Sequence, residues 1–280
     1  IPEIAEHFAD AVEKGFRESP QVDLESLSDY EQMKSKLSME VVSAEKNAEL
    51  LESVPHERME DMAVVYRFVL DQTDSGNGTI LVTNQLLDQY GITKEQLRAD
   101  AMENAPEIRP SEIRGMSEVM SELAPGMIPE VAPEDEQMFV ATVPDKIHGA
   151  GVIAYPNFME DAAEKMGGDF FVLPSSIHEV LLVKDNGQMT AKELENMVKE
   201  VNATQVEPAD QLTDHVYHYD SQNHIFELAD KYEERQREAE HDAPDKDSVL
   251  GDLKEKKQEI AKKDPAKDAA TKAATKKHET

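Results

Sequence analysis

Cysteine is absent from this chain of 280 residues. Its absence excludes a disulfide framework, a thiolate nucleophile, and any zinc or iron–sulfur centre that cysteine would hold. No apolar run approaches the roughly 20 residues that a membrane-spanning helix needs, and no signal peptide is visible. These absences fit a reducing compartment, so we predict a cytoplasmic protein without a membrane span.

Basic residues are scarce, because 29 lysines and arginines stand against 59 aspartates and glutamates, and the net charge is −30. A body this acidic repels nucleic acid phosphates and anionic membrane surfaces. We therefore expect neither direct nucleic acid binding nor membrane binding. A charged, solubilising surface explains the acidity, and the alternative is an acidic nucleic-acid mimic that occupies a basic protein.

Hydrophobic residues are also few, at 39% of the chain, against a usual fraction of roughly 45–50% that also counts glycine. Part of the chain is therefore expected to stay unpacked. From residue 242 onward the composition is dominated by Lys, Asp, Ala and Thr, which bury too little apolar surface to offset the entropy of ordering. We predict a single domain over residues 1–240 and a charged low-complexity tail over residues 241–280, disordered or transiently helical.

Short β-prone runs separated by turn residues recur along the predicted domain. The densest core signal consists of the apolar runs 170–173 and 180–183, on either side of a Pro-Ser-Ser turn. Turn residues between β-prone runs are typical of hairpins. Further hairpins are predicted to pair residues 62–70 with 79–83, 138–143 with 149–155, and 216–219 with 225–226, and a short strand is predicted at 39–42.

Helical periodicity and breaker residues define the predicted helices. They cover residues 3–16, 24–37, 45–52, 93–104, 111–123, 157–166, 190–202 and 227–240. Capping boxes are expected at Thr93 with Gln96 and at Thr190 with Glu193. Strands and helices do not alternate in a strict β-α-β order, which favours an α+β fold whose largely antiparallel sheet is built from hairpins with interspersed helices.

The turn at residues 174–179 brings hydroxyls, an imidazole and a carboxylate together. A nucleophile needs a base within hydrogen-bond reach, and Ser176 and His178 would share one face of an extended chain while Glu179 points the other way. No Gly-x-Ser-x-Gly elbow surrounds either serine. A tight turn whose serine hydroxyls cap backbone groups explains the pattern. The alternative is a binding site formed by Ser175, Ser176, His178 and Glu179.

The remaining histidines offer weaker candidates. His215 and His218 have His-x-x-His spacing, but on the predicted strand they lie on opposite faces and cannot share a metal ion. His148 lies in a predicted turn, and with His178 and a carboxylate it would make a composite site.

Glycine-rich stretches at 76–78 and 149–151 lack the spacing of phosphate loops and do not lead into a helix. We therefore predict no cofactor. Because no nucleophile, metal cluster or phosphate loop is assembled in the sequence, we predict a non-enzymatic binding or interaction module with an unknown protein partner. The alternative is a hydrolase or ligand-binding enzyme centred on the turn at 174–179.

Several segments in a fixed order carry a resemblance to a known family. They cover residues 45–56, 80–84, 100–106, 149–156, 173–180 and 197–204, with Pro-Ser-Ser-Ile-His-Glu and Val-Asn-Ala-Thr as the most specific parts. Over roughly residues 1–220 the chain resembles the bacterial domain of unknown function 5688. Members usually carry a further N-terminal segment of β character, so the resemblance implies a sequence truncated at its N-terminus. It implies no assigned activity and no catalytic residues.

Overall fold

The computed structural model describes residues 26–73, 76–127, 131–174 and 176–242. Among these residues, those up to Asp230 belong to one compact unit and those from Lys231 to Asp242 to a second. All the sites described below lie in the first unit. The predicted helix over residues 3–16 and all of the predicted tail over 241–280 beyond Asp242 lie outside the described residues.

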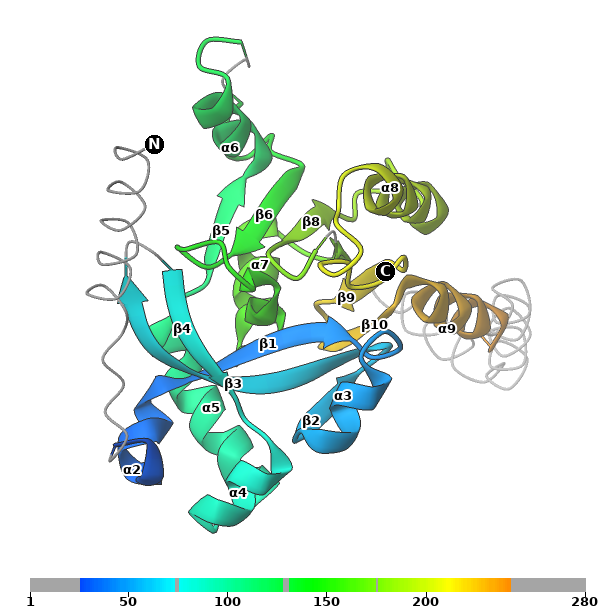
Figure 1. Ribbon diagram of the computed structural model, residues 1–280. Helices are drawn as coiled ribbons and strands as arrows, with labels where there is room; N and C mark the ends of the chain where they lie inside the picture. The colour runs from blue at the N-terminus through cyan, green and yellow to red at the C-terminus, as the bar shows by residue number, and fades with distance from the viewer. Residues whose placement is uncertain (1–25, 74–75, 128–130, 175, 243–280) are drawn as a thin grey trace, which may run out of the picture. The chain divides into compact units, whose positions relative to one another are not determined.

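A four-stranded antiparallel sheet is organised around β3 (Met62–Thr73), as Figure 1 shows. The first part of β3 pairs with β2 (His56–Met59), and its later part pairs with β4 (Gly76–Leu81). β1 (Leu37–Ser43) pairs along the other side of β3 and forms an edge of the sheet. The predicted short strand and the predicted hairpin that contain these runs are both confirmed.

A six-stranded sheet has the order β10-β9-β7-β8-β6-β5. Its strands are β5 (Glu112–Gly115), β6 (Met138–Thr142), β7 (Phe170–Leu173), β8 (Val180–Lys184), β9 (Tyr217–Asp220) and β10 (Ile225–Leu228). The two apolar runs that dominated the sequence are the central pair, β7 and β8. Every strand pair that the structure describes is antiparallel, which confirms the α+β class with largely antiparallel sheets.

Helices cover parts of both sheets. They are α2 (Tyr30–Met33), α3 (Ala48–Ser53), α4 (Asn84–Tyr90), α5 (Lys94–Ile108), α6 (Met116–Leu123), α7 (Phe158–Met166), α8 (Ala191–Thr204) and α9 (Ala229–Asp242). Three 3₁₀ turns complete the described elements: η1 (Ser26–Ser28), η2 (Lys34–Lys36) and η3 (Gly149–Ala154). α5 packs against β1 through a buried face that includes Leu97 and Ala101.

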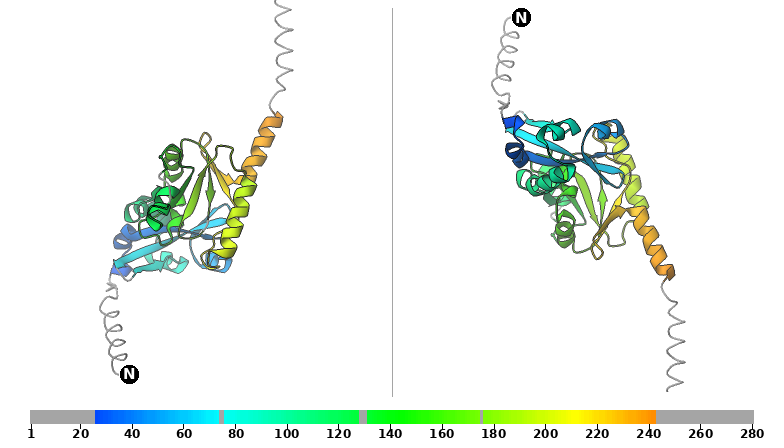
Figure 2. Two further views of the ribbon diagram at one scale, coloured as in Figure 1. Left: turned by 90° about the horizontal axis from the view of Figure 1, so that it is seen from above. Right: turned by 90° about the horizontal axis from the view of Figure 1, so that it is seen from below.

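α8 combines a local capping signal with tertiary packing. The Thr190 hydroxyl accepts a hydrogen bond from the Glu193 amide, and the Glu193 carboxylate accepts one from the Thr190 amide at 2.8 Å, so the predicted capping box is confirmed. Leu194 and its neighbours on the same face pack against Phe171 of β7. Figure 2 shows α8 beside the six-stranded sheet.

η3 lies against the outer edge of β1, where two glycines permit a close approach. A Cβ atom added to Gly151 would lie 2.2 Å from the carbonyl oxygen of Met39, and one added to Gly149 would lie 2.1 Å from the Thr142 hydroxyl. Any side chain would therefore force the backbones apart. The contact covers a strand edge and joins the two sheets.

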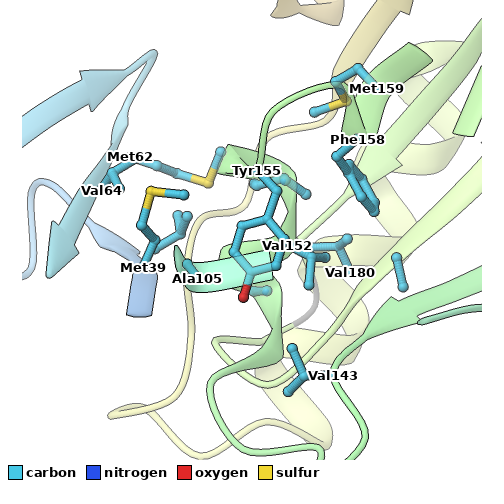
Figure 3. Packing of buried hydrophobic residues seen from close by; sticks show 14 of the residues in the cluster. Met39, Met62, Val64, Ala105, Val143, Val152, Tyr155, Phe158, Met159 and Val180 are labelled. Atoms are coloured by element: carbon cyan, nitrogen blue, oxygen red, sulfur yellow. The ribbon is translucent and has the colours of Figure 1, made fainter. Parts of the chain in front are cut away.

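The principal hydrophobic core runs through both sheets. Figure 3 shows Met39 and Val64 of the four-stranded sheet on one side of this cluster, with Phe158 and Val180 on the other and Tyr155 between them. The core therefore depends on residues whose separation in sequence is large, with η3 and the start of α7 filling the space between the sheets.

The prediction of a strand at residues 149–155 is wrong, because this segment forms η3. The run Val152-Ile153 is β-prone, but the two glycines before it make the close backbone contacts described above. The predicted hairpin with residues 138–143 is wrong as well, since β6 pairs with β5 and β8 instead.

Three other element boundaries differ from the sequence-based prediction. α5 continues through Pro106 to Ile108, because its buried face still packs against the core there. The predicted helix over 111–123 begins with β5, and the one over 24–37 consists, where it is described, of three short helical turns before β1.

At the start of α5 the Thr93 cap is confirmed, whereas the Gln96 side-chain amide donates to Asp100 instead of returning to the cap.

Candidate functional site

The turn between β7 and β8 contains the residues that the sequence singled out. Ser175 lies outside the described residues. The Ser176 hydroxyl accepts a hydrogen bond from the backbone amide of His178 at 3.1 Å, as expected for a serine that caps a turn. Glu179 is half-buried and lies immediately before β8. The Ser176 hydroxyl therefore contacts the main chain of His178, whereas the His178 imidazole has other partners.

Hydrogen bonds to its main chain hold this turn to three other segments. The Ala150 amide donates to the Ile177 carbonyl at 3.1 Å, and the Ile177 amide donates to the Asp210 carbonyl at 2.8 Å. The Thr142 hydroxyl donates to the His178 carbonyl at 2.7 Å. Each such bond contributes about 1 kcal/mol, so the turn is a fixed junction in the fold.

His148 and His178 lie in direct contact. The backbone amide of His148 donates to Nδ1 of His178 at 3.2 Å, and the two ring centroids are 5.6 Å apart at 78°. Because an amide can only donate, Nδ1 of His178 is an acceptor, and the proton of a neutral ring lies on Nε2. That nitrogen is 3.6 Å from an Asp210 carboxylate oxygen. The structure thus brings together the two histidines of the predicted composite site.

A buried carboxylate completes the arrangement. Glu40 Oε2 is 3.3 Å from Nδ1 of His148 and 2.6 Å from Nε of Arg67, and the Glu40 side chain is 3% exposed. Burial raises the pKa of Glu40, but the contacts with His148 and Arg67 outweigh it and hold the pKa below its ordinary value. We call Glu40, Arg67, His148, His178 and Asp210 the Glu40 cluster.

Sequence reasoning found the two histidines of the Glu40 cluster and missed its other members. Glu40 lies on β1 and Arg67 on β3, and the register places them two pairs apart on the same face of the sheet, since Glu40 pairs with Val65 and Arg67 with Ser38. No local signal marks either residue. Within the described ranges, no group of three or more His, Cys, Asp or Glu side chains is placed to hold a metal ion.

His215 and His218 contact different carboxylates. His215 Nδ1 is 2.9 Å from Asp61, whereas the fully buried His218 has Nε2 at 3.0 Å from Asp185. His215 precedes β9, so the two histidines do not lie on one strand as predicted, and each has its own carboxylate partner.

His215 also lines a polar cavity of about 390 Å³ at the turn between β2 and β3. Asp61 in this cavity accepts hydrogen bonds from Thr213 and Tyr217 as well. Burial raises the pKa of Asp61, but these bonds and the contact with His215 outweigh it and lower the pKa overall. The lining lysine Lys46 donates to Gln211 at 2.8 Å. Several polar groups that line this cavity therefore hydrogen-bond to one another.

A second cavity, of about 260 Å³, has a different lining, and we call it the methionine cavity. Its apolar wall comes from β1, β2, β3, α5 and η3. The wall consists of Met39, Met59, Val64, Met102, Ile153 and Ala154. Small-molecule sites are usually concave and mostly apolar, with a few polar groups that fix orientation. The methionine cavity fits that description better than the polar cavity does.

Two buried tyrosines and three charged residues complete the methionine cavity. Burial raises the pKa of Tyr66, and the nearby Glu57 raises it further. Burial also raises the pKa of Tyr155 to about 12, so both phenols are neutral near pH 7. At the rim, Arg98 Nε is 2.7 Å from Glu57 Oε2, and Arg58 is exposed. The sequence did not indicate this cavity, because its lining comes from five separate elements.

Comparison with known proteins identifies the family and no activity. No helix in the described part of the chain is long and apolar enough to cross a membrane. No curated protein and no solved structure matches the chain. The model of the Family of unknown function (DUF5688) matches residues 1–221. The match covers more than half of the 280 residues, so this chain belongs to the DUF5688 family.

Proposed function

We propose that this protein is a non-enzymatic binding module that holds a small, largely apolar molecule in the methionine cavity. The observation that carries the proposal is a concave apolar wall with three methionines, two neutral tyrosines and charges only at the rim. Methionine side chains are unbranched and polarisable, and they adapt to ligands of different shape. The cavity volume of about 260 Å³ is far larger than a single water molecule needs.

Filling the cavity tests the proposal. Ala154 is a half-buried residue of the wall, and Ala154→Phe would place an aromatic ring in the space that the ligand needs. Ala124, at the end of α6, is also half-buried and does not line the cavity, so Ala124→Phe is the matched control.

The binding assay uses 1-octanol and octanoate as probes, followed by chemical-shift changes of the protein amides. We expect binding by the unmodified chain and by Ala124→Phe, and loss of binding by Ala154→Phe. The proposal fails if neither probe shifts the amides of the cavity wall, or if Ala154→Phe binds as well as the control.

A second candidate is a hydrolase, which one observation favours. Nδ1 of His148 faces the Glu40 carboxylate at 3.3 Å, which leaves Nε2 to act as a base, and a carboxylate that orients an imidazole is half of a catalytic triad. Ser176 is the described hydroxyl of this turn. This candidate predicts cleavage of simple esters that is lost in His148→Ala. Equal ester turnover by the unmodified chain and the variant would exclude the hydrolase candidate.

A further inference from the structure

One face of the four-stranded sheet forms a wall of the methionine cavity. Directly paired residues of neighbouring antiparallel strands project to the same face, as do residues two positions apart on one strand. Met39 of β1 pairs with Tyr66 of β3, and Glu57 of β2 pairs with Val64 of β3. Met59 lies two positions after Glu57 on β2. Two methionines, a tyrosine ring and a carboxylate therefore share this face.

The helix α5 supplies another wall of the cavity. Arg98 and Met102 lie four positions apart on α5 and therefore share one side of the helix. Arg98 Nε is 2.7 Å from Glu57 Oε2, so this side of α5 lies against the face of the sheet that carries Glu57. The third methionine of the lining, Met102, thus comes from a wall different from that of the first two.

The charges at the methionine cavity cancel. Glu57 and Arg98 form an ion pair, whereas Arg58 pairs with Ala63 and projects to the opposite face of the sheet. The other side chains of the lining are apolar or, as in the two tyrosines, neutral. A ligand with a net charge would lose its hydration here without gaining a counter-ion. The cavity therefore favours a neutral occupant.

The ion pair still offers hydrogen bonds to a neutral ligand. The contact with Arg98 uses Oε2 of Glu57, and a carboxylate has several acceptor positions on its two oxygens. A guanidinium has five N–H donors, of which this contact uses one. A hydroxyl or amide group at this end of the cavity can therefore donate to Glu57 or accept from Arg98.

Building on the binding function proposed above, we propose that the occupant of the methionine cavity is a neutral molecule with an aromatic ring and one hydroxyl or amide group. The ring contacts the methionine side chains, because their polarisable sulfur atoms interact favourably with aromatic rings. The Tyr66 ring adds a partner for a tilted or edge-to-face contact. The hydroxyl or amide group binds the pair of Glu57 and Arg98. Arylalkyl alcohols and amides have this chemistry.

The test compares the affinities of 2-phenylethanol, 2-cyclohexylethanol and phenylacetate for the full chain. The two alcohols differ in the π system of the ring, and phenylacetate replaces the alcohol by an anion. We expect 2-phenylethanol to bind about fivefold more tightly than 2-cyclohexylethanol, although the larger apolar surface of the saturated ring would by itself favour the latter. Phenylacetate should bind more weakly than 2-phenylethanol.

Leucine variants test the sulfur atoms, because leucine keeps the approximate volume of methionine. The combined substitutions Met39→Leu, Met59→Leu and Met102→Leu should bring the affinities of the two alcohols within about twofold. Met102→Leu alone should lower the preference by less, and it provides the test if the combined variant does not fold. Met120→Leu and Met197→Leu change partly exposed methionines of α6 and α8, and each should keep the full preference.

The outcomes separate this inference from the function on which it rests. Equal or tighter binding of 2-cyclohexylethanol, with both alcohols lost in Ala154→Phe, would keep the binding function and overturn the aromatic ring. Tighter binding of phenylacetate would overturn the neutral ligand, and a preference that the folded leucine variants leave unchanged would overturn the sulfur contact. If no probe binds the unmodified chain, the binding function itself is overturned. Melting temperatures close to that of the unmodified chain show which variants are folded.

Discussion

Glu40 Oε2 and His148 Nδ1 lie 3.3 Å apart. This contact joins β1, at the edge of the four-stranded sheet, to the residue that precedes η3. Arg67 approaches the same carboxylate oxygen at 2.6 Å. A carboxylate with a side chain only 3% exposed needs such partners to stay ionised. The four-stranded sheet is therefore joined to the segment between β6 and η3 by a polar contact as well as by the apolar core.

Replacing the carboxylate at this junction should weaken the fold. Glu40→Gln keeps the size of the side chain but removes its charge, which leaves Arg67 without its buried anionic partner. We expect the free energy of unfolding to fall by about 2 kcal/mol at neutral pH. Urea unfolding followed by circular dichroism measures this difference.

The same variant should have a defined pH dependence. Contacts with His148 and Arg67 hold the pKa of Glu40 below its ordinary value of 4.5 in the folded protein. A carboxyl group with a lowered folded-state pKa stabilises the fold above its unfolded pKa, and this stabilisation is lost as the pH falls through the folded pKa. The loss in free energy of unfolding that Glu40→Gln causes should therefore become smaller below about pH 4.5.

Glu200→Gln is the control for this experiment, because Glu200 is exposed on α8. It should unfold much like the unmodified chain at each pH. If the loss in free energy of unfolding caused by Glu40→Gln stays constant as the pH falls, the charge of the Glu40 carboxylate does not have the role assigned to it.

Gly151 should tolerate no side chain. Gly151→Ala would place a Cβ atom 2.2 Å from the Met39 carbonyl oxygen, and neither backbone can move without separating η3 from β1. We expect a loss of about 3 kcal/mol in the free energy of unfolding, or failure to accumulate as folded protein. Urea unfolding and the yield of soluble protein measure the effect.

Gly91→Ala provides the comparison for Gly151→Ala. Gly91 ends α4 with φ at 65°, and an added Cβ would meet nothing within 4 Å. Its cost is conformational alone, about 1 kcal/mol. If the two variants lose equal stability, steric contact with Met39 does not explain the glycine at 151.

The parts of the fold that could be predicted are those in which local signals agree with the tertiary contacts. The run at 170–173 is apolar throughout and is buried at the centre of a sheet, and Thr190 with Glu193 caps α8 as expected. At 149–155 the local signal was misleading. The β-prone run there is held in η3 by backbone contact with Met39, a residue remote in sequence.

The candidate sites were harder to predict, because their residues come from segments that are remote from one another in sequence. His148 and His178 could be considered together because histidines are few, and the structure places them in contact. Glu40 is one of 59 acidic residues, and nothing in the sequence around it indicates a buried ion pair. The wall of the methionine cavity carries ordinary core residues such as Met102, whose exposure to a cavity depends on how five elements pack.

His178 should stabilise the fold through its acceptor nitrogen. The His148 amide donates to Nδ1 at 3.2 Å, so His178→Ala leaves this half-buried amide without its acceptor and should cost about 1–2 kcal/mol. His178→Asn places a carbonyl oxygen near the position of Nδ1 and should recover much of the loss. Hydrogen exchange of the His148 amide, measured by NMR together with urea unfolding, distinguishes the two variants. Equal losses in Ala and Asn would contradict the role of this bond.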